Sequence, residues 1–171
     1  MQTELIPCRL EDLDILRAIS SQTYYEAFAG QNSKETMRTY LAEAFSREKM
    51  LEELQNAGSR FYFLYADGKL AGYIKLNEAP AQTDINDEES LEIERIYVHK
   101  DFQGAGLGRV LMEYALQQTK AMGKSYAWLG VWEENPAAIG FYQRLGFRKV
   151  GEHHFRMGEE LQKDWVMRHD L

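Results

Sequence analysis

The 171 residues and their 44% hydrophobic content suit one domain with a sizeable core, over residues 1–171, and leave little room for two. The formal net charge of -7 at pH 7 disfavours a protein that binds nucleic acid through its phosphates, and it favours a cationic partner. The apolar runs are too short to span a bilayer and residues 1–9 lack the pattern of a signal peptide, so we expect a cytoplasmic protein without a membrane partner.

The first third of the chain is expected to contain one short strand followed by three helices. The strand is predicted around residues 3–9. Apolar residues then recur on one helical face until Gly30 ends the pattern. Asn32 or Ser33 can cap a second helix, and Ser46 can cap a third, shorter one. The main sheet is therefore expected to follow these helices.

Two strands and an acidic loop are predicted next. Residues 60–66 and 70–76 are rich in aromatic and apolar side chains and flank Asp67-Gly68, a strong hairpin signal, so they should pair antiparallel. The segment 77–89 then contains five acidic residues and no basic one. Such a composition is typical of a solvated loop, and it also suits the mouth of a cation site.

A strand that ends at Val98 leads into three glycines and a predicted amphipathic helix from Arg109. Glycines let the backbone approach a ligand closely, and the N-terminal end of a helix favours an anion, so this stretch predicts phosphate binding. A purely structural turn is the alternative on spacing alone. A dinucleotide-binding fold fits poorly, because its glycines would follow the first strand of alternating β and α units.

The last third is expected to add a strand, a helix and two closing strands. Residues 126–132 are apolar almost throughout, as in a strand covered on both faces, and should run parallel to the strand before the glycines. Asn135-Pro136 is typical of a helix start, and Leu145-Gly146 of its end. The closing strands are predicted around residues 147–156 and 164–171.

No metal site is expected from this sequence. The lone cysteine, Cys8, excludes an internal disulfide and has no companion cysteine for a metal. The four histidines show no metal-ligand spacing with cysteines or carboxylates. Neither residue type therefore predicts a metal-dependent reaction.

Two motifs resemble those of the GCN5-related N-acetyltransferases (GNAT). Gln103-Gly104-Ala105-Gly106-Leu107-Gly108 matches the family signature Gln/Arg-x-x-Gly-x-Gly/Ala, and Asn135...Phe141-Tyr142...Leu145-Gly146-Phe147 is similar to its second signature. GQNSKETMRTYLAEAF, SLEIERIYV and WLGVWEENPAAIGFY more closely resemble PaiA-type spermidine/spermine N-acetyltransferases. The resemblance implies a three-layer α/β fold of the mixed α+β kind. Its mostly antiparallel sheet would splay between two parallel strands, with helices on both faces.

The resemblance also implies that acetyl-CoA is the donor, CoA the product, and that most cofactor contacts lie on one segment. Pantetheine would pair with the backbone near Ile96, Tyr97 and Val98, where backbone amides could also hold the thioester oxygen. The pyrophosphate would lie on the backbone amides of Gln103, Gly104, Ala105, Gly106, Leu107, Gly108 and Arg109. Asn135 and Tyr142 would contact the cofactor from the second motif.

Three residues are the expected catalytic groups. The resemblance implies that Tyr142 protonates the departing CoA thiolate, whereas spacing alone would make it a core aromatic. An amine arrives as an ammonium and must first lose a proton. Glu94 lies nine residues before Gln103, as does the catalytic carboxylate of related polyamine acetyltransferases, and Glu92 shares its strand face. We favour Glu94 as the base, and Glu92 or a water relay are the alternatives. A purely structural alternative is that one of these carboxylates only forms an ion pair with Arg95.

Two carboxylates in one partly buried cleft are expected to raise each other's pKa, so that one acts as the base while the other attracts the cation. Other side chains are candidate walls for a polyamine, since carboxylates offset ammonium charge and aromatic faces add cation–π attraction. These candidates are Glu26, Tyr24, Trp128, Trp132 and Glu133.

The leading hypothesis is an acyltransferase that moves acetyl from acetyl-CoA directly to a primary amine of spermidine or spermine. Two alternatives stay open. One is a family relative that acts on a peptide N-terminus, a ribosomal protein or another small amine. The other is a non-catalytic regulator that senses acetyl-CoA or polyamine. A homodimer is compatible with the sequence, whereas the acidic balance disfavours a nucleic-acid partner.

Overall fold

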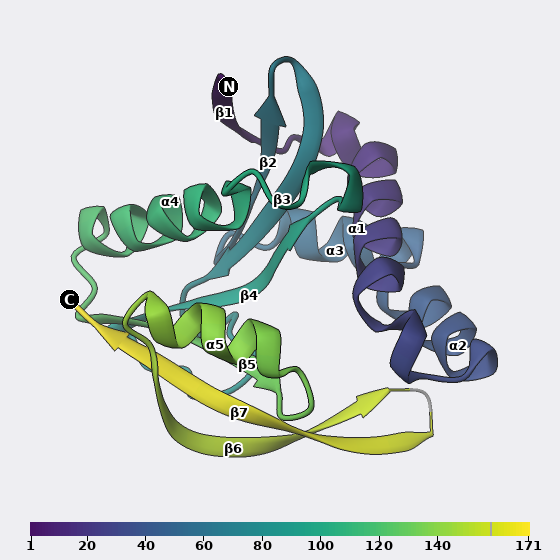
Figure 1. Cartoon of the computed structure of the whole chain (residues 1–171). Helices are drawn as coiled ribbons and strands as arrows, with labels where there is room; N and C mark the ends of the chain where they lie inside the picture. The colour runs from purple at the N-terminus through teal and green to yellow at the C-terminus, as the bar shows by residue number, and fades with distance from the viewer. Residues whose placement is uncertain (158) are drawn as a thin grey trace.

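The computed structural model describes residues 1–157 and 159–171 and arranges them in three layers (Figure 1). The strands form a seven-stranded sheet in the order β1-β2-β3-β4-β5-β7-β6. They are β1 Thr3–Pro7, β2 Ser59–Ala66, β3 Lys69–Asn77, β4 Ser90–Val98, β5 Tyr126–Trp132, β6 Arg148–Met157 and β7 Glu160–Asp170. The helices are α1 Leu13–Phe28, α2 Lys34–Ala44, α3 Arg47–Gln55, α4 Leu107–Ala121 and α5 Pro136–Arg144.

Side-chain caps begin three of the helices. Ser33 Oγ accepts a hydrogen bond from Thr36 N at the start of α2, so Ser33 rather than Asn32 is the cap. Ser46 and Asn135 cap α3 and α5 in the same way. The fourth helix, α4, begins two residues before the predicted Arg109, because Gly106 adopts a left-handed conformation and ends the loop there.

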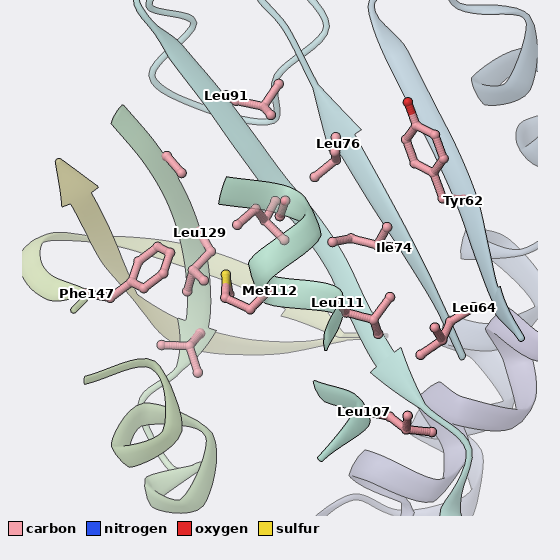
Figure 2. Packing of buried hydrophobic residues seen from close by; sticks show 14 of the residues in the cluster. Tyr62, Leu64, Ile74, Leu76, Leu91, Leu107, Leu111, Met112, Leu129 and Phe147 are labelled. Atoms are coloured by element: carbon pink, nitrogen blue, oxygen red, sulfur yellow. The ribbon is translucent and has the colours of Figure 1, made fainter. Parts of the chain in front are cut away.

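Two hydrophobic cores lie on opposite faces of the sheet. On one face α4 and α5 cover β2 to β5, and Figure 2 shows Leu107, Leu111 and Met112 of α4 pointing onto that sheet. On the other face α1, α2 and α3 pack on β2 and β3 through a cluster that contains Leu16, Met50 and many aromatic side chains. The predicted three-layer arrangement is therefore confirmed.

A β-bulge divides β4 into two halves. Lys75 of β3 lies opposite Arg95, but the next residue, Leu76, lies opposite Ile93, so Glu94 is the extra residue of β4. Before the bulge Ile93 packs under α4, and after it Ile96 takes over that face. The extra residue thus turns Glu94 and Arg95 toward the same helical layer, that of α1 to α3.

Among the described strands one pair, β4 and β5, is parallel, and it is short. β4 and β5 pair from Ser90 opposite Tyr126 to Glu92 opposite Trp128, and their pairing stops there. β5 continues to Trp132 as a partner of β7, while β4 continues to Val98 as a partner of β3. The sheet is therefore split between two parallel strands, as expected. In the described part of the chain no helix is both long and apolar enough to cross a membrane.

Candidate active site

A cleft of about 570 Å³ lies where β4 and β5 separate. β4 lines it with residues 92–98 and β5 with residues 129–132. Further side chains come from α1, α5, the acidic loop and the hairpin of β6 and β7. The cleft reaches Gln103 at the start of the glycine loop, so one continuous space connects that loop with the layer of α1 and α2.

The glycine loop has the shape of an anion cradle. Gly104 and Gly106 have φ angles of 84° and 77°, which favour glycine, and a Cβ on either would meet no atom within 4 Å. Their outer face is therefore open to a ligand. Gln103 Nε2 donates to the Val98 carbonyl oxygen at 3.2 Å and ties the loop to the end of β4. The N–H groups of the first turn of α4 have no partner within the helix, which suits a pyrophosphate.

Close packing of α4 against α5 supports this cradle. A Cβ on Gly108 would lie 3.3 Å from Phe141 Cζ, so a larger residue would require the Phe141 ring to shift. Arg109 is exposed beside the cradle and pairs with Glu113 at 3.1 Å. These residues fit a CoA-type pyrophosphate, and Arg109 could add a charge to it.

The second half of β4 offers its backbone to the cleft. Ile96 and Val98 pack their side chains under α4 and α5, while the Tyr97 ring stacks 6.0 Å from that of Tyr73 on the other face. No β5 residue pairs with this half among the described residues. Its backbone can therefore pair with an extended ligand as an added strand would, which is what the expected pantetheine contact requires.

Glu92 is a buried carboxylate at the closed end of the cleft, with 2% exposure. It accepts hydrogen bonds from Asn77 Nδ2 and Thr83 N, each at 2.9 Å, and from the Thr83 hydroxyl. Burial raises the pKa of Glu92, although the hydrogen bonds from Asn77 and Thr83 act in the opposite direction. Glu92 therefore has a higher proton affinity than an ordinary glutamate.

Glu94 lines the same cleft but belongs to a buried ionic cluster. Its carboxylate lies 2.6 Å from Lys75 Nζ and 3.3 Å from Arg95 NH2, and Glu53 pairs with the same two cations. Burial by itself would raise the pKa of Glu94, but Arg95 and Lys75 outweigh it and lower the pKa to about 2. The expectation that the two carboxylates raise each other's pKa is therefore wrong for Glu94.

Tyr142 lies on α5 and lines the cleft. Its ring packs 6.0 Å from that of Phe147, as the spacing of a core aromatic predicted. Burial raises the pKa of Tyr142 to about 12, so the phenol keeps its proton at neutral pH. Asn135 also lines the cleft, and its side chain accepts a hydrogen bond from Ala138 N as the cap of α5. A proton donor and a helix cap thus face the space between β4 and β5.

The predicted walls of the amine site divide into two groups. Tyr24 and Trp132 line the cleft, with Phe28 6.0 Å from the Trp132 ring. Trp128, in contrast, is fully buried: it packs with Tyr126 and Val166 and donates to Gln82 Oε1 of the acidic loop at 3.2 Å. Trp128 is therefore not among the described residues that line the cleft, although it lies opposite Glu92 in the sheet.

The two predicted acidic walls also lie elsewhere. Glu26 accepts a hydrogen bond from Lys100 N and faces His99, and Glu133 is exposed in the turn after β5. Neither is among the described residues that line the cleft. The cleft instead takes its outer carboxylates from Asp84, in the acidic loop that the sequence offered as the mouth of a cation site, and from Asp164, which the sequence did not single out.

The hairpin of β6 and β7 reaches toward α2 beside the cleft (Figure 1). Thr36 Oγ1 donates to Glu160 Oε1 at 3.1 Å, and Gln162 Nε2 donates to Asn32 Oδ1 at 3.1 Å. Gln162 also lines the cleft. These contacts narrow access to the cleft from that side.

In the described ranges, no three His, Cys, Asp or Glu side chains are placed to hold a metal ion. The cleft contains four carboxylates, Asp84, Glu92, Glu94 and Asp164, together with Arg95 and Arg156. Arg95 is occupied by Glu53 and Glu94 and lies 5.2 Å over the Phe45 ring. The described cleft thus offers carboxylates, aromatic faces and a phenol to a ligand.

Comparisons with known proteins agree with this geometry. Residues 21–147 match the Acetyltransferase (GNAT) family. The chain is 41% identical over 161 residues to a protein of Lactobacillus delbrueckii subsp. lactis described as an uncharacterized N-acetyltransferase in the pepI 3′ region, over 94% of this chain and 93% of that protein. It is 26% identical over 152 residues to the spermidine N(1)-acetyltransferase of Thermoplasma acidophilum, over 86% and 89% of the two chains.

A solved structure gives the same fold. The PaiA N-acetyltransferase from Thermoplasma acidophilum, in complex with coenzyme A, superposes with a TM-score of 0.80 at 23% identity and covers 100% of both chains. At that identity the likeness concerns the fold. These comparisons confirm the predicted GNAT family and support the predicted relation to PaiA-type proteins.

Proposed function

The chain belongs to the acetyltransferase (GNAT) family, and we propose that it transfers the acetyl group of acetyl-CoA directly to a primary amine of a polyamine such as spermidine or spermine. One observation carries the proposal. A single cleft along the separated strands β4 and β5 connects the glycine cradle with a phenol, two buried carboxylates and an aromatic wall. Acetyl-CoA and the amine can therefore bind in one space, so the acetyl group can pass directly between them without a covalent acyl-enzyme intermediate.

The donor would be held mainly by backbone groups. The amides from Gln103 to Arg109 would bind the pyrophosphate, and the free edge of Ile96 to Val98 would pair with pantetheine. When bound, acetyl-CoA supplies the activated thioester. The CoA complex of the Thermoplasma PaiA protein supports this choice of cofactor.

The chain's own residues would manage two protons. Tyr142 Oη, which burial keeps protonated, would donate to the leaving sulfur. The ammonium must lose a proton before attack, and Glu92 accepts one more readily than Glu94 because its pKa is raised whereas that of Glu94 is lowered to about 2. We therefore transfer the proposed role of base from Glu94 to Glu92, acting directly or through a water.

The acceptor side of the cleft supports a slender cationic amine. Trp132 and Phe28 offer aromatic faces, and Asp84 and Asp164 add negative charge at the outer wall. The contacts of the β6–β7 hairpin with α2 narrow this end, which disfavours a folded protein as the acceptor. The spermidine N(1)-acetyltransferase relative adds support.

The test is release of CoA from acetyl-CoA with a panel of amines at equal concentration. The panel contains spermidine, spermine, a short peptide with a free N-terminus and an aminoglycoside. We expect the highest kcat/KM with spermidine or spermine, and no release without an amine. Preference for the peptide would overturn the polyamine assignment, and CoA binding without release for every amine would favour a sensing role.

A further inference from the structure

Three ionisable groups from distant parts of the chain form a line along the outer wall of the cleft. His153 of β6 lies between two aspartates, with Nδ1 3.1 Å from Asp84 Oδ2 and Nε2 3.4 Å from Asp164 Oδ2. His153 and Asp164 are direct cross-strand partners in the hairpin, whereas Asp84 belongs to the acidic loop before β4. The imidazole therefore joins that loop to the hairpin.

The close approach of this line to the sheet has a specific cause. A Cβ on Gly130 of β5 would lie 3.3 Å from His153 Cε1 and 3.4 Å from Asp164 Oδ2. Because Gly130 has no side chain, the His153–Asp164 pair can lie against β5 at the point where the cleft opens. The hydrogen bond that His153 donates to Asp164, with a smaller contribution from Asp84, raises the pKa of His153, which strengthens both ion pairs.

The residue next to Asp84 reaches the proposed base. Thr83 donates to Glu92 twice, from its backbone N to Oε1 at 2.9 Å and from its hydroxyl to Oε2. Asn77 Nδ2 is the third donor to this carboxylate. Two of the three hydrogen bonds that orient Glu92 therefore come from a single loop residue, whose neighbour is held by His153.

We propose that His153 is a positioning residue for the reaction: by holding Asp84 against the hairpin, it keeps Thr83 hydrogen-bonded to Glu92 and fixes the orientation of that carboxylate. This inference rests on the proposed function insofar as Glu92 is the base. The placement of Thr83 by His153 can be measured without turnover.

Charged groups surround both Glu92 and His153, and a test of the proposal must separate their direct electrostatic effects from positioning. Glu92 faces Asn77 and Thr83 and feels the negative charge of Glu94, which Lys75 and Arg95 balance. His153 faces Asp84 from the loop and Asp164 from β7, and the cleft wall also contains Tyr24, His154 and Arg156. A direct field of His153 on Glu92 is therefore the rival explanation.

The two explanations predict opposite shifts in the Glu92 pKa when Asp84 is replaced. Loss of the Thr83 hydrogen bonds removes groups that lower the pKa of Glu92, so positioning predicts a higher Glu92 pKa in both His153→Gln and Asp84→Asn. A direct field predicts opposite shifts, because one substitution removes a positive charge and the other a negative one. Asparagine can still accept the Ile85 N hydrogen bond that Asp84 Oδ1 receives, so the local turn is retained.

The experiment is a pH titration of the Glu92 side-chain carboxyl by ¹³C NMR in the full chain, with the resonance assigned by its loss in Glu92→Gln. Samples are the wild type, His153→Gln, Asp84→Asn, Thr83→Val and the double variant His153→Gln/Thr83→Val. Glu152→Gln is the matched control, since Glu152 precedes His153 on β6 but pairs with Lys149 and Lys163 on the exposed face.

We expect all three single substitutions to raise the Glu92 pKa and the control to match the wild type. The double variant should titrate as His153→Gln does, because that substitution alone already releases both Thr83 hydrogen bonds. Opposite shifts for His153→Gln and Asp84→Asn, or additive shifts in the double variant, would overturn the proposal. If His153→Gln fails to fold, Asp84→Asn still decides the sign, and if Asp84→Asn fails to fold, the double variant still separates positioning from a direct field. A wild type without amine-dependent CoA release would refute the proposed function and leave this titration interpretable.

Discussion

Glu92 and Glu94 accept hydrogen bonds from the same nitrogen, Asn77 Nδ2, at 2.9 Å each. Their surroundings nevertheless differ, because Glu94 contacts two cations while Glu92 contacts neutral donors. One carboxylate thus holds its charge to low pH and the other gains proton affinity. This division favours a structural role for Glu94 and supports the proposed chemical role of Glu92.

The structural role of Glu94 can be measured as stability. Glu94→Gln leaves Lys75 and Arg95 with Glu53 as their remaining carboxylate in the described cluster, and a buried charge that loses its partner costs about 3 kcal/mol or more. We expect a loss of that size in the free energy of unfolding by urea. Glu152→Gln, which removes two exposed ion pairs, should change it by much less. A loss in Glu94→Gln no larger than that of the control would remove the structural role.

The pH dependence of stability follows from the same contacts. The pKa of Glu94 falls from 4.5 to about 2 on folding, so its stabilisation is fully present above pH 4.5 and is lost as the pH drops toward 2. Glu92, whose folded pKa is raised, acts oppositely and weakens stability as the pH rises through that pKa. We expect the stability difference between the wild type and Glu94→Gln to shrink between pH 4.5 and 2. A difference that is constant over this range would mean that Glu94 has no depressed pKa.

The arrangement of β4 shows how far the sequence could predict this site. The strand, the glycine loop and the α5 cap follow from local patterns and are present in the structure. The sequence also contains a sign of the bulge. Apolar residues stand at odd positions before Glu94-Arg95, at Leu91 and Ile93, and at even positions after it, at Ile96 and Val98, as one extra residue in the strand would cause. The sequence analysis assumed regular alternation, so it predicted Glu92 and Glu94 on one face of the strand but did not predict that Arg95 lines the cleft.

Other parts of the site have no local pattern. His153 meets Asp84 across 69 positions, and Lys75 meets Glu94 only because β3 and β4 pair in one register. Trp128 and Trp132 stand on the same strand with an even spacing, yet the first is buried and the second lines the cleft, because the partner strand β4 leaves β5 between them. Long-range pairing decides these positions, and composition alone does not show it.

The cradle depends on the left-handed conformation of its glycines. Gly106→Ala places a side chain at φ 77°, where an L-residue costs about 1–2 kcal/mol. If the loop relaxes to avoid that strain, the amides no longer converge on the pyrophosphate, so we expect roughly tenfold weaker CoA binding by calorimetry. Gly68→Ala is the matched control, since Gly68 has φ 79° in the β2–β3 turn. The Gly68→Ala variant should lose similar stability and keep its CoA affinity. Equal CoA affinities in the two variants would contradict the proposal that the glycine loop binds the pyrophosphate.

The phenol of Tyr142 should act in the chemical step rather than in binding. Tyr142→Phe removes the proposed donor to the leaving sulfur but keeps the ring that packs against Phe147, so we expect kcat to fall by about 10²- to 10⁴-fold with CoA affinity retained. Because burial raises the pKa of Tyr142 to about 12, its loss of a proton should not limit the wild-type rate anywhere near neutral pH. Tyr114→Phe is the control, as Tyr114 packs on Tyr62 and is not among the described cleft-lining residues. Steady-state kinetics with CoA calorimetry separate the outcomes: a loss of CoA affinity with unchanged kcat would make Tyr142 a binding residue, and an equal loss of kcat in both variants would deny it any specific role.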